Sequence, residues 1–242
     1  MAHDPKRYGQ QWAADYDQTD GQGDLDTAAA VKALAKLAGS GQVLELAAGT
    51  GRIAIPLAET GLKVTATDAS PEMIDQLHAN DKQSLVTARV EALPVINGTQ
   101  TYGLICIVLN SLWALPTAED QLHCLRNAAA KLKPGGALVV EMFVANPQRW
   151  LRPCTVQFGV AKAVQTTDWN PATQRVVHNI HFDEQYDTPY PDRDIELRIV
   201  WPNELLLMAQ VAGLRADQLW SSWAGETFGA DSTNMIAIFR KQ

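Results

Sequence analysis

The sequence predicts an α/β fold: a doubly wound, mostly parallel seven-stranded sheet with an appended antiparallel sheet, within a single domain. Two observations carry this prediction. Apolar strand-like runs alternate with helix-like segments between residues 43 and 143, which is the pattern of a parallel sheet covered by helices. After Asn146-Pro147 the helical spacing disappears, and residues 155–201 alternate as antiparallel strands do.

The chain before the first strand divides into a polar stretch and a helix. Residues 1–23 mix charges and glycines with Tyr8, Trp12 and Tyr16, so they form either a flexible arm or a lid over a site. The alanine-rich stretch 24–37 then predicts a helix that ends before Gly39.

The next elements predict strands, helices and turns in alternation. A first strand begins at Val43 and passes through a glycine turn into a helix, and a second strand ends at Asp68. Ser70 and Pro71 are typical of a helix start, because serine caps the free N–H groups and proline suits the first turn. Further strands are predicted at 84–90, 101–113 and 137–143, with a helix at 118–132 that stops at the KPGG sequence 133–136.

The remaining chain predicts the appended sheet and the close of the core. Strands are predicted at 175–182 and 195–201, with a turn at 168–171. A helix at 202–212 then precedes strands at 215–223 and 234–241. The expected division is an N-terminal helical cap or lid at 1–40, a core at 41–146 and 202–242, and a substrate lid at 147–201.

Composition limits the possible partners. The net charge of −7 and the lack of a basic run argue against nucleic acid, and no apolar run approaches the length that spans a membrane. Cys106, Cys124 and Cys154 are odd in number and widely spaced, which favours reduced thiols over a disulfide frame or a zinc site. We therefore expect a cytoplasmic protein without a metal, as a monomer or a homodimer.

The glycine turn indicates a cofactor site. Gly49 and Gly51 permit backbone angles and close contacts that a side chain would prevent, and the following helix presents free N–H groups. The spacing also fits a dinucleotide fingerprint, with Asp68 at about the distance expected of a ribose-binding carboxylate. An NAD(P)-dependent oxidoreductase is thus an alternative, as is a cofactor-binding module without catalysis.

Four motifs in order distinguish between these readings: VLELAAGTGR at 43–52, TDAS at 67–70, ICIVLNSLW at 105–113 and LKPGGALVVE at 132–141. Together they resemble the class I S-adenosylmethionine-dependent methyltransferases of small-molecule type. The resemblance implies a Rossmann-like core, S-adenosyl-L-methionine as cofactor, and direct in-line methyl transfer to an O, N or C nucleophile of a small organic acceptor. The positions that match the family's cofactor site are Tyr16, Glu45, Ala47, Gly49, Gly51, Asp68, Ala69, Met73, Arg89, Val90, Leu109 and Asn110.

One turn departs from the family pattern. Arg89 stands where the family has an acidic residue facing adenine, and Val90 falls where the backbone meets the ring. Glu91 is the alternative if the register shifts. Asn110 has two readings as well: a contact between cofactor and acceptor, or a cap of the following turn.

The candidates for a catalytic base lie in the appended sheet: His178, His181 and Tyr186. Histidine can accept a proton near neutral pH. Because the two histidines are three residues apart, they face opposite sides of a regular strand, and at most one points into the site. A structural role is the alternative for each. Arg198 either holds an acidic substrate group or pairs within the protein.

Overall fold

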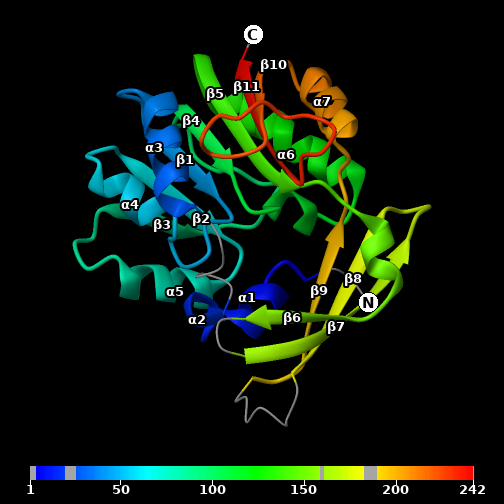
Figure 1. Ribbon diagram of the computed structural model, residues 1–242. Helices are drawn as coiled ribbons and strands as arrows, with labels where there is room; N and C mark the ends of the chain where they lie inside the picture. The colour runs from blue at the N-terminus through cyan, green and yellow to red at the C-terminus, as the bar shows by residue number, and fades with distance from the viewer. Residues whose placement is uncertain (1–3, 20–25, 159–160, 183–189, 242) are drawn as a thin grey trace.

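The computed structural model describes residues 4–19, 26–158, 161–182 and 190–241. Figure 1 shows a large helix-covered sheet with a smaller sheet beside one of its ends. The N-terminal helices lie between the smaller sheet and helix α5 (Pro71–Asn80). This arrangement places the carboxyl ends of the core strands opposite the smaller sheet.

The large sheet has seven strands in the order β10-β11-β5-β4-β1-β2-β3. Its strands are β1 (Val43–Leu46), β2 (Val64–Asp68), β3 (Val86–Val90), β4 (Tyr102–Ile107), β5 (Leu132–Phe143), β10 (Leu214–Trp220) and β11 (Asn234–Lys241). Only β11 runs antiparallel to its neighbours, β5 and β10. The predicted fold class, a doubly wound and mostly parallel sheet, is confirmed. The strand order reverses between β1 and β4, and ligands bind such sheets outside the strand ends at that point.

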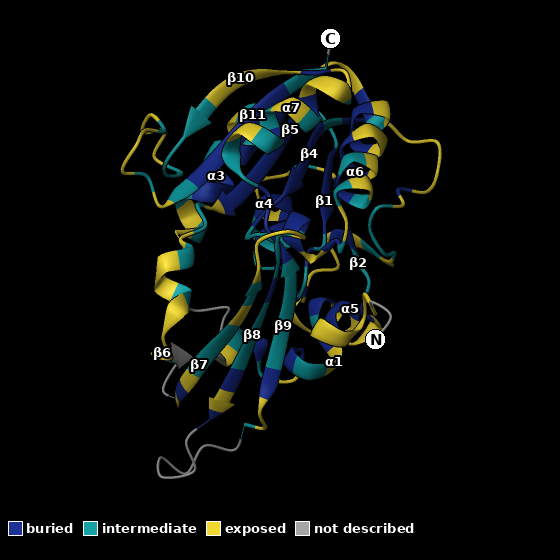
Figure 2. Cartoon of the chain, turned by 90° about the vertical axis from the view of Figure 1, so that its right-hand side faces the viewer, coloured by how far each residue is buried: buried dark blue, intermediate teal, exposed yellow. Residues whose placement is uncertain are grey.

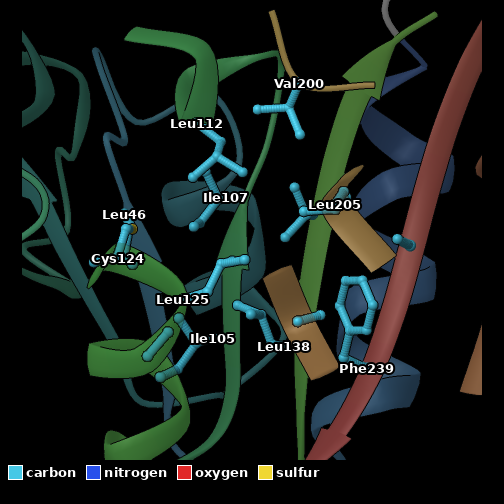
Figure 3. Close-up of a cluster of buried hydrophobic side chains, with 14 of the residues drawn as sticks. Leu46, Ile105, Ile107, Leu112, Cys124, Leu125, Leu138, Val200, Leu205 and Phe239 are labelled. Carbon is cyan, nitrogen blue, oxygen red and sulfur yellow. The ribbon is translucent and has the colours of Figure 1, made fainter. Parts of the chain in front are cut away.

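Helices cover both faces of this sheet. Helices α3 (Thr27–Ala38) and α4 (Ala54–Glu59) pack on one face, and α6 (Ala118–Lys131) and α7 (Pro202–Val211) pack on the other. Figure 3 shows the second interface, where Leu125 and Leu205 meet Ile105, Ile107 and Leu138 of the central strands. The middle parts of the central strands are buried (Figure 2), which explains their nearly continuous apolar sequences.

The start of each core helix follows from its sequence. The side chains of Asp26, Ser70 and Thr117 accept hydrogen bonds from backbone N–H groups in the first turn of α3, α5 and α6. Such caps satisfy donors that have no partner inside the helix.

The smaller sheet is antiparallel, in the order β6-β7-β8-β9. Its strands are β6 (Cys154–Phe158), β7 (Ala161–Asn170), β8 (Arg175–Phe182) and β9 (Arg193–Arg198). The prediction of a turn at 168–171 was wrong, because β7 continues to Asn170 and the chain turns at 171–174. Asn170 Oδ1 accepts from the N–H groups of Ala172 and Thr173, and Gln174 takes the positive φ that the turn needs.

Two further boundaries differ from the prediction. The KPGG sequence belongs to β5, which starts at Leu132 directly after α6. Its register shifts against β4, so residues 133–136 form a bulge with Gly135 at φ +74°. The apolar run 101–113 is also not a single strand. β4 ends at Ile107, and residues 111–114 form the short 3-10 helix η1 (Ser111–Ala114).

The N-terminal residues form α1 (Arg7–Trp12) and α2 (Tyr16–Thr19). This segment contacts both the smaller sheet and the core. On the side of the smaller sheet, the buried Arg193 of β9 pairs with Asp15 and lies over the ring of Trp12, 4.5 Å from its centroid. On the core side, Asp17 accepts from Thr50 Oγ1 at 2.6 Å and from Asn80 Nδ2 at 2.8 Å. These helices therefore bridge the glycine turn and the smaller sheet.

Arg198 joins the smaller sheet to the core. Its guanidinium is buried and donates to Gln121 Oε1 on α6 at 2.6 Å, to Gln174 Oε1 at 2.9 Å and to Glu204 Oε1 on α7 at 2.8 Å. These contacts occupy the side chain within the protein. The sequence allows Arg198 either to hold an acidic substrate group or to pair within the protein, and the structure supports pairing within the protein.

In the part of the chain that the structure describes, no helix is both long and apolar enough to cross a bilayer.

We expect Arg198→Ala to lower the free energy of unfolding by about 3 kcal/mol, because it leaves the buried amide of Gln121 and the partly buried carboxylate of Glu204 without their partner. Urea denaturation measures this. Arg215→Ala is the control: that side chain is 61% exposed and lies 3.8 Å from Asp217, so its loss should cost less than about 1 kcal/mol. Equal losses in the two variants would contradict the role of Arg198.

Candidate functional site

The glycine turn after β1 is built from alternating backbone conformations. Ala47, Gly49 and Gly51 all have positive φ, at 55°, 56° and 90°. A Cβ at Gly49 would meet nothing closer than 4.0 Å, so this glycine leaves open space beside the turn. A Cβ at Gly51 would instead lie 2.7 Å from Ile55 and 2.9 Å from Leu77. Gly51 therefore serves packing of the turn against its helices, and it does not line the cavity described below.

Asp68 holds this turn in place. Its Oδ2 accepts from the N–H of Gly49 at 2.9 Å, and its Oδ1 accepts from the N–H of Ser70 at 2.9 Å. Burial raises the pKa of Asp68, against the opposing effect of these backbone donors. Each carboxylate oxygen keeps a lone pair for a further donor. Asp68 thus ends β2 with a fixed orientation and remaining capacity to bind a hydroxyl.

Glu45 is a buried carboxylate with an unused oxygen. The residue is 1% exposed, and its Oε2 is a buried atom without a hydrogen-bond partner in the described chain. Burial raises its pKa to about 8, while the charge of Arg52 acts in the opposite direction. A buried oxygen of this kind suits a cationic donor, such as the ammonium group of a bound ligand.

At the end of the third strand, Glu91 lies on the cavity wall, whereas Arg89 and Val90 do not. Neither Arg89 nor Val90 lines the cavity, and Val90 is 51% exposed. Glu91 does line it, beside Leu93. Its backbone N–H donates to the carbonyl of Asp68 at 2.8 Å, which brings the turn next to the end of β2. This is the alternative that a register shift predicts.

Asn110 follows β4 in a strained connection. Leu109 and Asn110 both have positive φ, at 50° and 60°, and both line the cavity. The side chain of Asn110 accepts from the N–H of Phe143 at 2.6 Å, which ties the end of β4 to the end of β5. Asn110 thus has a structural bond and a place on the cavity wall.

Sequence reasoning missed Glu141. This buried residue accepts from the N–H of Leu109 at 3.0 Å through Oε2 and from Trp223 Nε1 at 2.7 Å through Oε1. It fixes the β4 connection and holds the loop before β11 over the cavity. The signal was available, since a glutamate within the apolar stretch ALVVEMF requires partners.

The smaller sheet contributes an aromatic wall. Trp150, from the 3-10 helix η2 (Pro147–Leu151), lies edge-on to Trp169 at 5.3 Å and to His178 at 5.8 Å between ring centroids. His178 Nδ1 lies 3.0 Å from Gln165 Nε2 and 2.9 Å from Thr167 Oγ1. Burial lowers the pKa of His178 to about 4. The His178 side chain in this aromatic wall is therefore uncharged at neutral pH.

The other two catalytic candidates are placed differently. His181 lies outside the cavity wall, and its Nδ1 contacts Asp192 Oδ2 at 2.8 Å, with its side chain 56% exposed. Tyr186 lies outside the described residues. Of the three candidates, only His178 is placed on the cavity wall by the described structure.

One cavity of about 2170 Å³ connects these groups. It runs from the glycine turn to the aromatic wall, and Tyr8 and Tyr16 of the N-terminal helices border it. The predicted cofactor positions on its wall are Tyr16, Glu45, Ala47, Gly49, Asp68, Ala69, Met73, Leu109 and Asn110. Pockets that bind one drug-sized ligand measure roughly 300–1,000 Å³, so this cavity has room for two ligands side by side.

The known proteins that this chain resembles include several methyltransferases. The sequence model of the family described as "Methyltransferase domain" matches residues 43–136. The cypemycin N-terminal methyltransferase of a Streptomyces species is 26% identical over 208 residues, covering 83% of each chain. The structure of the CcbJ methyltransferase from Streptomyces caelestis has a TM-score of 0.88 and 29% identity, covering 98% of this chain and 99% of that one.

The fold extends to more distant structures, including the sugar N-methyltransferase KedS8 from Streptoalloteichus, with a TM-score of 0.68 and 16% identity over 92% of this chain and 91% of that one. The chain belongs to the class I S-adenosylmethionine-dependent methyltransferases. It is an enzyme of that class, and S-adenosylmethionine is its cofactor. The oxidoreductase and the non-catalytic module are set aside.

We expect Glu45→Gln to remove a pH dependence of stability. The folded state raises the pKa of Glu45 from 4.5 to about 8, so the stability that its bound proton contributes is complete below pH 4.5 and is lost as the pH rises toward 8. Glutamine stays neutral at every pH. The free energy of unfolding of the variant, relative to that of the wild type, should therefore rise by roughly 2–4 kcal/mol between pH 5 and 8.5.

Urea denaturation of the cofactor-free protein at several pH values measures this difference. Glu119→Gln is a suitable control, because that side chain is 81% exposed and its removal should leave the pH profile unchanged. A Glu45→Gln difference that is constant with pH would refute the buried, protonated carboxylate.

Proposed function

We propose that this enzyme transfers the methyl group of S-adenosylmethionine to an amine nitrogen of a small organic molecule. The observation that carries the proposal is the single cavity that joins the glycine turn and Asp68 to the aromatic wall of Trp150 and Trp169. One end offers a carboxylate and open backbone, and the other offers aromatic surface. Both ligands of a bimolecular transfer therefore fit in one continuous cavity.

The residues at the first end fit the cofactor. Gly49 leaves open space, and the free Oε2 of Glu45 suits the ammonium group of the methionyl part. We assign the ribose hydroxyls to Asp68, whose oxygens are already oriented by two backbone donors. Glu91 is assigned to the adenine end, with Met73 and Tyr16 as apolar wall.

When bound, S-adenosylmethionine supplies an electrophilic methyl group on a sulfonium. The protein has to align the acceptor with it and exclude water. We assign alignment to Leu109 and Asn110, which Glu141 and the N–H of Phe143 hold at the middle of the cavity. Residues 147–201 act as the substrate lid and residues 1–40 as the cap in this proposal.

Charge supports an amine as the acceptor. Among the described residues that line the cavity, carboxylates outnumber arginines by ten to four, and no lysine lines it. Such a wall attracts cationic ligands and disfavours acceptors that carry a carboxylate or a phosphate. The name of the cypemycin N-terminal methyltransferase, which denotes methylation at an N-terminus, is consistent with an amino group as acceptor.

A methylation screen tests the proposed function. S-Adenosylmethionine with a labelled methyl group is incubated with the enzyme and with cyclic amines, phenols and carboxylic acids of similar size. We expect the label in the amines, located on nitrogen by mass spectrometry. Label found only in phenols or carboxylic acids would refute the assignment of an amine as the acceptor. The enzyme would still be shown to transfer methyl groups.

We expect Asp68→Asn to weaken S-adenosylmethionine binding roughly tenfold to a hundredfold, because a neutral amide replaces the charged acceptor of the ribose hydroxyls. Calorimetry measures the dissociation constant. Asp26→Asn is a matched control, since Asp26 also borders the cavity but caps α3 through Ala29. The affinity of Asp26→Asn for S-adenosylmethionine should stay close to that of the wild type. Unchanged affinity in Asp68→Asn would exclude Asp68 from the cofactor site.

A further inference from the structure

His178 occupies the inner face of the smaller sheet, which is the face toward the core. On β8 it is paired with Thr167 of β7 and Ile195 of β9, so these three side chains share that face. Trp169 and Gln165 are at alternate positions on the same face of β7, and both line the cavity with His178. The histidine therefore lies within the aromatic wall where an acceptor would bind.

The hydrogen bonds of Nδ1 determine which nitrogen carries the proton. Gln165 Nε2 lies 3.0 Å from Nδ1, and an amide NH₂ group can only donate. Nδ1 is therefore an acceptor, and Thr167 Oγ1 at 2.9 Å is a second donor to it. A neutral imidazole has one N–H, which must then be on Nε2. Nε2 itself makes no hydrogen bond to any residue that the structure describes.

The surroundings of His178 keep the ring neutral. The groups that contact or pair with it are Trp150 from η2, Gln165 and Thr167 from β7, and Ile195 from β9, and none of them is charged. Arg193, two positions from Ile195 on the same face of β9, is paired with Asp15. Asp194 and Glu196, the neighbours of Ile195 on β9, also line the cavity, but strand alternation directs their side chains to the face opposite His178. Burial alone lowers the pKa to about 4, so the ring is a weak proton acceptor.

We propose that His178 is a specificity-determining hydrogen-bond donor, whose Nε2–H binds an oxygen atom of the acceptor molecule, and that it is not a general base. This inference rests on the proposed function of the cavity. The acceptor class is an amine on a ring that also carries a hydroxyl or carbonyl oxygen. Trp150 and Trp169 contact the apolar surface of that ring, and His178 donates a hydrogen bond to its oxygen atom.

The methyl transfer balances without a protein base. The bound ammonium form of the amine first gives one proton to water, and the lone pair of the uncharged amine then attacks the methyl carbon. The carbon–sulfur bond breaks, and the bonding electrons remain on sulfur as a thioether. The product is an ammonium ion, which then releases its proton to water. A neutral histidine donor is compatible with every part of this step.

The test compares His178→Gln with His178→Ala on two probes, 3-hydroxypyrrolidine and pyrrolidine. Glutamine retains an amide donor at about the reach of Nε2 but cannot remove a proton. We expect wild type and His178→Gln to prefer the hydroxylated amine in kcat/KM. His178→Ala should lose roughly tenfold to a hundredfold on that amine and little on pyrrolidine, so that the preference disappears.

Equal losses in His178→Gln and His178→Ala on both amines would overturn the donor role in favour of a base. Methylation of neither amine by the wild type, with S-adenosylmethionine bound, would overturn the proposed function, and the substrate assignment with it. Comparison of urea midpoints shows whether each variant is folded.

Nitrogen-15 NMR of the wild type tests the histidine without any acceptor. We expect the Nε2–H tautomer of His178, with no titration between pH 6 and 9. An Nδ1–H tautomer, or a titration midpoint near 6.5, would overturn the proposal whatever the enzyme methylates. Gln165→Glu is the matched variant: a carboxylate beside Nδ1 raises the pKa of the ring, so a titrating resonance should appear.

Discussion

The hydrogen bonds of the Asp68 carboxylate are the interaction on which the site depends. They join the end of β2 to Gly49 of the turn after β1 and to Ser70 at the start of α5. Three elements are thus fixed relative to one another by one side chain. The N-terminal helices then attach to this unit through Asp17, which accepts from Thr50 and Asn80. The cavity wall is assembled outward from that point.

The motifs that sequence reasoning identified well are local. The glycine turn, Asp68 at a strand end and Ser70 as a cap are each encoded within a few residues, so their backbone geometry follows from sequence. The alternation of strands and helices similarly predicted the core sheet and its class. The KPGG bulge was not predictable in the same way, because it depends on the register of β5 against β4.

The features that sequence reasoning missed or left open depend on contacts between distant segments. Gly51 is required by packing against Ile55 and Leu77, which only the folded turn reveals. Glu141 finds Trp223 at a separation of 82 residues. For the two histidines, strand alternation predicts opposite faces, but only the pairing with β7 and the approach of Trp150 show that His178 borders the cavity.

The excess of carboxylates on the cavity wall has a consequence for turnover. S-Adenosylmethionine carries a positive sulfonium, whereas the thioether left after transfer has lost that charge. The same wall therefore holds the fresh cofactor more strongly than the spent one, and the attraction weakens at the moment when exchange is needed. Because the cavity opens to solvent, added salt screens this difference, which couples the cycle of the enzyme to ionic strength.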